Sequence, residues 1–161
     1  MNWSDIKLVI FDADGTLRRR KDGQDKSPLA MNEWELMPGI EKAIDSIRHY
    51  PITFGIASNQ ACIGRGEVED NSAHVMLRRL ARDLFIGGGI HYENIKYCPH
   101  LPGTCSCRKP QPGMLYSIMM YWEVAPKETL FIGDAISDRK AAENCGCHFM
   151  NTNQFLELGK E

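Results

Sequence analysis

The sequence has no long apolar run, no strong excess of charge of one sign, and no internal repeat or low-complexity linker. No apolar stretch approaches the roughly 20 residues that cross a bilayer, which excludes a membrane-spanning helix. The apolar residues 8–11 follow Asp5 and are too few for a secretion signal. With a net charge of −2 and a pI of about 6.2, the bulk charge does not require nucleic acid or an anionic membrane as a partner.

What is present is typical of a soluble globular protein, because 43% of the 161 residues are hydrophobic and 25% are charged. This length predicts a single domain over residues 1–161 that is large enough to bury a core. We expect a cytoplasmic monomer. Its 6 cysteines would then lie in a reducing compartment, which favours metal ligands or buried thiols over disulfides.

Strand-like and helix-like segments alternate along the chain. Short apolar runs predict buried strands, and apolar residues at helical spacing predict helices between them. The predicted strands cover 7–12, 51–57, 94–97, 129–132 and 148–150, and the helical patterns cover 40–47, 73–84, 114–122 and 140–144. This alternation predicts an α/β fold, a Rossmann-like doubly wound parallel sheet with helices on both faces. Ligands of such sheets bind at the carboxyl ends of the strands.

The first predicted strand ends in two carboxylates, Asp12 and Asp14, and Gly15 and Thr16 suit a turn directly after them. A carboxylate can act as a nucleophile and form an aspartyl phosphate. A second carboxylate can protonate the leaving oxygen and later activate water. An ordinary Asp-Gly turn has the same local pattern, so this segment alone does not decide between catalysis and a plain turn.

Further polar residues follow later predicted strands and loops. Ser58 and Asn59 come after the second strand, where a hydroxyl and backbone N–H groups can hold phosphate oxygens, and Lys109 supplies a cation. Asp134 and Asp138 follow the strand before the last. Carboxylate oxygens at two strand ends suit Mg²⁺. Phosphoryl transfer needs this combination of nucleophile, metal, cation and hydroxyl around the developing charge.

The order of these motifs resembles that of the haloacid dehalogenase superfamily of phosphatases, over most of the chain. The motifs are Asp-x-Asp-Gly-Thr, Ser-Asn, Lys-Pro and Gly-Asp-x-x-x-Asp. The resemblance implies a Mg²⁺-dependent phosphomonoesterase that forms an aspartyl phosphate. It implies that Asp12 is the nucleophile and a Mg²⁺ ligand, and that Asp14 is the general acid and base, with its backbone carbonyl on the metal. Asp134 would complete the metal site, and Asp138 would support the metal or Lys109.

The same resemblance implies that Ser58 and Lys109 hold the phosphoryl group, with Asn59 in the same loop. Arg65 and Arg108 suit a second phosphate of the substrate, because a guanidinium grips phosphate bidentately. The segment between the first and second strands has room for a flap and one helix. We therefore expect an open pocket without a large cap domain.

A second metal site is predicted from soft ligands in the loop at residues 98–107, inserted before Arg108. Three thiolates and one imidazole suit tetrahedral Zn²⁺. All four ligands would come from the protein, so the site would be closed and structural, and it would stiffen the approach to Lys109. A cysteine-rich loop without metal is the alternative. The predicted ligands are Cys98, His100, Cys105 and Cys107.

Cys-Pro-His followed by Cys-x-Cys-Arg-Lys-Pro resembles the branch of histidinol-phosphate and heptose bisphosphate phosphatases. The segments 59–60 and 63–66 are nearer the heptose enzymes, whereas the short step from His100 to Cys105 is nearer the histidinol enzymes. The substrate is therefore expected to be a sugar phosphate such as heptose 1,7-bisphosphate, or histidinol phosphate. One departure is Ala13, where that branch usually has arginine.

Several alternatives stay open on the sequence alone. The basic run 18–21 suits a solvated hairpin, or it attracts a second phosphate or a nucleic-acid backbone, which leaves a nucleic-acid 3′-phosphatase as an option. A receiver-type signalling domain shares the aspartates, Mg²⁺ and lysine, but it needs its phospho-accepting aspartate after a middle strand. A zinc-stabilised binding module would leave filled catalytic positions unused. Cys145 and Cys147 favour packing over a further metal or redox pair.

Overall fold

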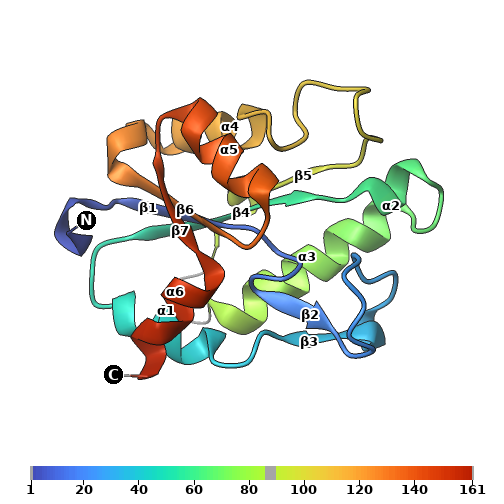
Figure 1. Ribbon diagram of the computed structural model, residues 1–161, viewed down its shortest axis with the longest axis horizontal. Helices are drawn as coiled ribbons and strands as arrows, with labels where there is room; N and C mark the ends of the chain where they lie inside the picture. The colour runs from blue at the N-terminus through green and yellow to red at the C-terminus, as the bar shows by residue number, and fades with distance from the viewer. Residues whose placement is uncertain (1, 86–89, 161) are drawn as a thin grey trace.

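A five-stranded parallel sheet forms the centre of the protein, as seen in a computed structural model that describes residues 2–85 and 90–160 (Figure 1). The strand order is β5-β4-β1-β6-β7, so the predicted α/β class and parallel sheet are confirmed. The strands are β1 (Leu8–Phe11), β4 (Thr53–Asn59), β5 (Ile95–Cys98), β6 (Thr129–Gly133) and β7 (His148–Asn151). In the described part of the chain no helix is long and apolar enough to cross a membrane.

Helices cover both faces of the sheet, with α4 and α5 on one side and α1, α3 and α6 on the other (Figure 1). Their bounds are α1 (Ile40–Ile47), α2 (Ala61–Gly64), α3 (Asp70–Leu84), α4 (Gly113–Trp122), α5 (Ile136–Cys145) and α6 (Thr152–Glu157). Short 3-10 turns lie at Trp3–Asp5, Met31–Glu33, Tyr92–Asn94, Pro126–Glu128 and Leu158–Lys160. Helices α2 and α6 were not predicted, since segments of four and six residues carry little helical periodicity.

Alternation along β1 divides the core into two layers. Val9 and Phe11 pack with α1, α3 and α6, whereas Leu8 and Ile10 pack with α4 and α5. All four side chains are fully buried, because a strand in the middle of a parallel sheet is covered on both faces. The apolar stripes that predicted α1 and α3 are the faces that these helices bury. Local periodicity was therefore sufficient to place the main elements.

A two-stranded hairpin follows β1 and lies beside α3, on the side of the sheet that carries α1 and α6 (Figure 1). It pairs β2 (Arg18–Arg20) with β3 (Trp34–Leu36) in antiparallel register. This hairpin is the flap for which the sequence left room. The expectation of a solvated basic run is wrong for Arg18, whose side chain is buried, because the strand turns alternate side chains inward and outward.

The strand order brings the predicted catalytic residues to one edge. β1 lies between β4 and β6, and Asp12, Ser58 and Asp134 lie at the carboxyl ends of these three neighbouring strands. The chain moves from β1 toward β5 on one side and later toward β7 on the other, which places the topological switch point at β1. This is the position at which open α/β sheets bind their ligands.

Candidate active site

A buried ion-pair network links three predicted residues at the end of β1. The Lys109 ammonium donates to Asp12 Oδ1 at 2.5 Å and lies 2.7 Å from Asp138 Oδ1. It also donates to the Ala57 carbonyl at 2.8 Å. The Lys109 and Asp12 side chains are only 2% and 8% exposed. One lysine thus contacts two carboxylates, one directly after β1 and one in the first turn of α5, within a region shielded from water.

The shielding shifts the ionisation of this network. The pKa of Asp12 is raised to about 8, chiefly by burial, against the lowering effect of Lys109 and with the help of the charges of Asp138 and Asp14. Burial alone would lower the pKa of Lys109, but the charges of Asp12 and Asp138 outweigh it and raise that pKa. The lysine is therefore held as a cation because the two carboxylates lie beside it.

Asp134 approaches the same cluster because Gly15 leaves space for it. A Cβ at Gly15 would lie 2.3 Å from Asp134 Oδ2, and the residue has a φ of +90° that favours glycine. The Thr16 hydroxyl donates to Asp134 Oδ1 at 3.4 Å and lies 2.9 Å from the Thr152 hydroxyl of α6. Gly133 similarly admits Asp138, whose Oδ2 would lie 2.4 Å from an added Cβ.

The donor set and its charge fit a divalent cation. Carboxylate oxygens of Asp12, Asp134 and Asp138 all lie within 4.8 Å of one another. Partial burial and the neighbouring charge of Asp138 raise the pKa of Asp134. Within this cluster Lys109 offsets one of the negative charges, so a further cation would relieve the remaining repulsion. Hard oxygen ligands of this kind suit Mg²⁺.

Asp14 belongs to a second network that sequence reasoning missed. Its Oδ1 accepts from Arg18 Nε at 2.6 Å, and its Oδ2 accepts from Gln60 Nε2 at 2.8 Å. The same Gln60 nitrogen donates to Ser58 Oγ at 2.8 Å. The Ser58 hydroxyl therefore keeps its own proton for an acceptor such as a phosphate oxygen. The sequence marked Gln60 in the segment 59–60 and Arg18 in the basic run 18–21, but it did not indicate their contacts with Asp14, because only the fold brings these side chains together.

The other predicted phosphate-binding residues have different partners. The Asn59 side chain accepts from the Lys109 backbone N–H at 3.0 Å and donates to its carbonyl at 3.2 Å, so it clamps the lysine loop against β4. Arg65 is exposed and pairs with Glu67 at 2.8 Å. Arg108 directs Nη1 toward the His100 carbonyl at 3.5 Å. Both guanidinium groups thus point at partners outside the aspartate cluster.

The four predicted zinc ligands converge at one place in the loop. Cys105 Sγ lies 3.5 Å from the sulfurs of Cys98 and Cys107, and His100 Nδ1 lies 3.6 Å from Cys98 Sγ and 3.4 Å from Cys107 Sγ. A tetrahedral Zn²⁺ with Zn–S of about 2.3 Å and Zn–N of about 2.0 Å separates its ligand atoms by roughly 3.5–3.8 Å. All six cysteines are free thiols. The spacing and chemistry therefore fit a closed zinc site.

The zinc loop (residues 98–107) packs directly against the element that follows Ser58. A Cβ at Gly64 of α2 would lie 2.7 Å from the Pro99 carbonyl, and one at Gly113 would lie 3.3 Å from the Ser106 carbonyl. The loop is thus held between α2 and the start of α4. It ends at Cys107, two residues before Lys109, so the packing of the loop helps to position that lysine.

We expect Cys107→Ser to lose zinc and stability. A serine hydroxyl is a poorer zinc ligand than a thiolate, so elemental analysis should find well below one zinc per chain. The melting temperature should fall by about 5–10 °C, which is roughly 2–3 kcal/mol for a domain of this size. Cys147→Ser, in a half-buried cysteine outside the zinc loop, should keep its zinc. Full zinc content in Cys107→Ser would contradict the site.

Cys145 and Cys147 lie in and beside the core layer formed with α4 and α5. Cys145 is buried at the end of α5, and Cys147 packs against the same layer before β7. Their surroundings are those of small apolar residues that close a helix onto a strand. The interpretation of these two thiols as packing residues stays a prediction.

Comparison with known proteins gives one family over nearly the whole chain. The family described as polynucleotide kinase 3 phosphatase matches residues 7–156. D-glycero-beta-D-manno-heptose-1,7-bisphosphate 7-phosphatase of Bordetella bronchiseptica is 34% identical over 143 residues, which cover 88% of this chain and 78% of that protein. Its counterpart in Pseudomonas putida is 36% identical over 138 residues, covering 85% and 77%.

Two further comparisons concern a histidine biosynthesis protein and a solved structure. The histidine biosynthesis bifunctional protein HisB of Legionella pneumophila is 31% identical over 145 residues, which cover 89% of this chain but 40% of that longer protein. The crystal structure of D,D-heptose 1,7-bisphosphate phosphatase from B. bronchiseptica, complexed with magnesium and phosphate, matches with a TM-score of 0.76 and 31% identity. That match covers 89% of this chain and 79% of the other.

Proposed function

Since this chain belongs to the polynucleotide kinase 3 phosphatase family of the haloacid dehalogenase superfamily, and is a phosphatase, we propose that it hydrolyses a small sugar phosphate or bisphosphate with Mg²⁺. Histidinol phosphate is the second candidate substrate. The observation that carries the proposal is the buried contact of Lys109 with Asp12 and Asp138 at the carboxyl end of β1, with Asp134 in the same cluster.

In the proposed first step, a carboxylate oxygen of Asp12 attacks phosphorus and the bond from phosphorus to the leaving oxygen breaks. Asp14 supplies the proton to that oxygen, so an alcohol departs and an aspartyl phosphate remains on Asp12. In the second step, water attacks the same phosphorus and gives a proton to Asp14. The bond from phosphorus to the Asp12 oxygen breaks, so inorganic phosphate leaves, Asp12 is again a carboxylate, and Asp14 is again protonated.

The remaining residues hold charge around the phosphoryl group. Ser58 Oγ has a proton to donate, and Lys109 is fixed as a cation by its buried carboxylate partners. We assign the Mg²⁺ position to Asp12, Asp134 and the backbone carbonyl of Asp14, with Asp138 supporting Lys109. When bound, Mg²⁺ would neutralise charge on the nucleophile and on the phosphoryl oxygens. We assign Zn²⁺ to the zinc loop as a structural ion, which suits a reducing, cytoplasmic setting.

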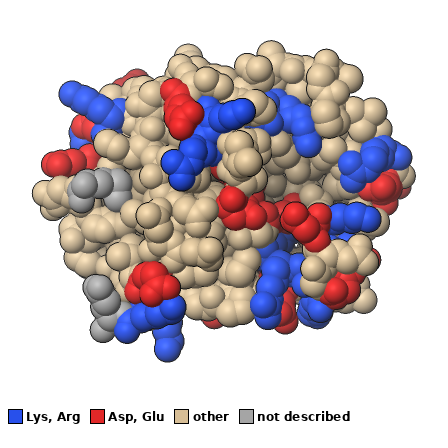
Figure 2. All heavy atoms as spheres, in the orientation of Figure 1, with Lys and Arg blue, Asp and Glu red and all other residues tan. Residues whose placement is uncertain are grey.

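The sugar phosphate class is favoured over a nucleic-acid end because the basic run on the hairpin is largely neutralised. Arg19 pairs with Glu35 at 2.7 Å, and Arg20 pairs with Asp22 at 2.6 Å and with Glu33 at 2.8 Å. Figure 2 shows acidic side chains beside basic ones at the end of the molecule that carries the hairpin. A surface for a phosphodiester backbone would need unpaired cations.

The test is phosphate release with Mg²⁺ from three substrates in parallel: heptose 1,7-bisphosphate, histidinol phosphate and a 3′-phosphorylated oligonucleotide. We expect the highest kcat/KM for the heptose compound, at least about tenfold above the others, which corresponds to about 1.4 kcal/mol of discrimination. Gel filtration of the same preparation should give the mass of a monomer.

The dependence of activity on salt concentration separates a nucleic-acid 3′-phosphatase from a sugar phosphatase. Activity on an oligonucleotide bound through several phosphates should fall steeply between low and high salt, whereas activity on a small sugar phosphate should fall little. A preference for the oligonucleotide together with a steep salt response would replace the sugar phosphate by a nucleic-acid end. Release from none of the three, or equal release from Asp12→Asn protein, would remove the proposed function.

A further inference from the structure

Arg18 is an arginine buried directly behind Asp14. Its side chain is 1% exposed, whereas that of Asp14 is 19% exposed. The guanidinium lies 5.5 Å from the centre of the Trp34 ring on the facing strand. Within the described residues, Nη1 and Nη2 of Arg18 are buried without a hydrogen-bond partner. Its Nε donates to Asp14 Oδ1 at 2.6 Å.

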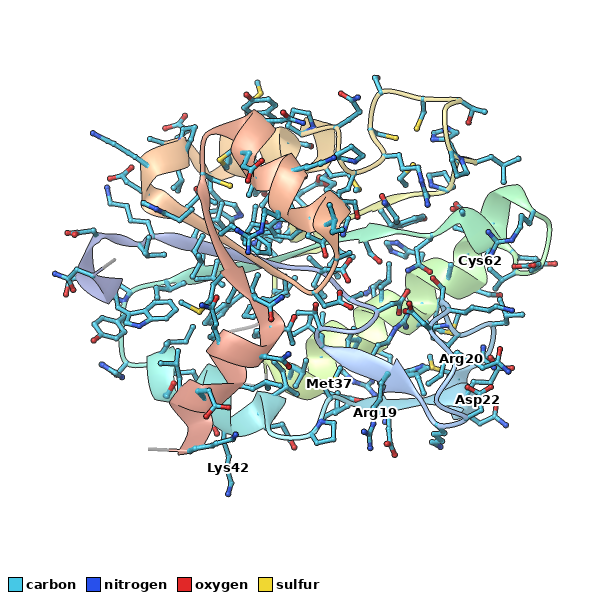
Figure 3. All side chains as sticks on the ribbon, in the orientation of Figure 1. Arg19, Arg20, Asp22, Met37, Lys42 and Cys62 are labelled. Atoms are coloured by element: carbon cyan, nitrogen blue, oxygen red, sulfur yellow. The ribbon has the colours of Figure 1, made fainter. Side chains whose placement is uncertain are left out.

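Such a group is costly to bury. A guanidinium loses its hydration free energy in the protein interior. The bond to one partly exposed carboxylate does not offset that loss while both Nη groups of Arg18 lack a hydrogen-bond partner. The neighbouring arginines of β2 show the ordinary solution, because Arg19 and Arg20 extend from the hairpin to exposed or half-exposed acidic partners (Figure 3). A buried guanidinium with unsatisfied Nη groups is expected where function requires it.

The contacts of Asp14 indicate what that function is. Arg18 holds one carboxylate oxygen and Gln60 holds the other, and Gln60 is itself fully buried and bonded to Ser58. The carboxylate is therefore fixed from two sides by groups that come from the hairpin and from the end of β4. Its torsion angle is set relative to Ser58, the residue proposed to hold the phosphoryl group.

The open side of Asp14 faces a cavity. A cavity of about 310 Å³ is lined by Asp14, Gly15, residues 18–20 and residues 23–26, which places it under the hairpin and beside the acid. This volume has room for the alcohol portion of a small phosphate ester. The Nη groups of Arg18 are sealed from solvent, so a ligand in the cavity meets Asp14 and the hairpin surface instead of those groups.

We propose that Arg18 is a positioning residue that aims the carboxyl group of Asp14 at the leaving oxygen of the substrate. The proposal rests on the proposed function, in which Asp14 transfers the proton. It concerns the first step, in which the alcohol departs. Misplacement of a proton donor by about 1 Å is enough to cost on the order of 100-fold in rate.

The test uses two leaving groups in first-turnover experiments with Arg18→Met, whose apolar side chain can still pack on Trp34. An alkyl phosphate needs its leaving oxygen protonated, whereas 4-nitrophenyl phosphate does not. We expect release of the alcohol from the alkyl phosphate to slow by about 30- to 100-fold. The first-turnover burst of nitrophenolate should stay within about threefold of that of the unaltered protein, and KM for the alkyl ester should change little.

The matched control is Arg79→Met, an exposed arginine of α3 that pairs with Asp83 at 2.7 Å and does not line the cavity, which should leave both rates unchanged. Arg18→Lys keeps a cation near Asp14 and should lose less alkyl ester activity than Arg18→Met. It also provides the test if the methionine variant does not fold. Melting curves should accompany each variant.

The outcomes separate the inference from the function on which it rests. Equal losses on the two leaving groups, a rise in KM alone, or no change in Arg18→Met would overturn the positioning role while the unaltered protein remains a phosphatase. A failure of the unaltered protein to release either leaving group would instead overturn the proposed function. A selective loss on the alkyl ester, partly restored in Arg18→Lys, supports both.

Discussion

Asp12→Asn should abolish phosphate release while leaving the protein folded. Asparagine has no carboxylate that can attack phosphorus, so no acyl phosphate forms. The value of kcat should therefore fall by about 10⁴- to 10⁶-fold, the range found when a hydrolase loses its nucleophile. The fold should persist, because asparagine keeps the size of Asp12 and an oxygen acceptor for Lys109. Stability should be equal or slightly higher, since burial already disfavours the Asp12 carboxylate and raises its pKa.

Phosphate release and a phosphoenzyme trap together check this expectation. Acid-quenched protein should carry label from a radioactive substrate only when Asp12 is present, and the label should disappear within the turnover time. Asp5→Asn, in an exposed acid near the N-terminus, should behave like the unaltered protein. Activity that survives in Asp12→Asn would sink the mechanism, and a label that persists for hours would favour a receiver-type domain.

Lys109→Met should remove both activity and a large part of the stability. The lysine offsets two carboxylates in a region where its own side chain is 2% exposed. Removal of one partner from a buried ion pair costs about 3–5 kcal/mol, because it leaves the opposite charge without compensation. The melting temperature should fall by about 10 °C or more. Phosphate release should fall at least about 100-fold, because the cation that we propose faces the phosphoryl group is lost.

The loss of stability should depend on pH in a defined direction. The folded-state pKa of Asp12, about 8, lies above its unfolded value of about 3.9, so ionisation of this group opposes folding as pH rises through that window. Without Lys109, which lowers the pKa of Asp12, ionisation of Asp12 destabilises the folded protein more. In Mg²⁺-free buffer the deficit of Lys109→Met should therefore be larger near about pH 8.5 than near about pH 6.

Lys7→Met is the matched control for this variant. Lys7 lies 2.6 Å from Glu128, but its side chain is 61% exposed, and an exposed pair contributes about 0–1 kcal/mol. Denaturation by urea at both pH values measures the two variants side by side. A Lys109→Met protein as stable as Lys7→Met would mean that the cluster around Asp12 is already compensated in another way.

Sequence patterns were sufficient for most of the fold, with errors at the ends of elements. The second strand was predicted at 51–57 and lies at Thr53–Asn59, and α5 was predicted from 140 but begins at Ile136. The start of α5 depends on Asp138, whose side chain accepts from the Ala135 backbone N–H at 3.0 Å. A residue predicted only as a catalytic support thus also caps the helix, which hydrophobic periodicity cannot reveal.

In the site, as in the fold, the sequence indicates local chemistry, whereas the tertiary structure decides the contacts. The order of the motifs and the family resemblance that it carries were enough to name Asp12, Asp14 and Lys109 as candidate site residues. They could not show that Arg18 is buried or that Gln60 joins two of the predicted residues. Those facts depend on which strand lies beside which, and on the face to which the hairpin turns.

The identity of the proposed catalytic groups, their order and the ligand types that suit two metals are therefore properties of the chain itself, since they depend on residue chemistry and short spacing. Their arrangement is a property of the fold. Lys109 meets Asp12 across 97 positions, and Gln60 meets Asp14 across 46. Contacts over such separations form only when packing of the two core layers fixes the strand order, and the shifted pKa of Asp12 exists only because that packing excludes water.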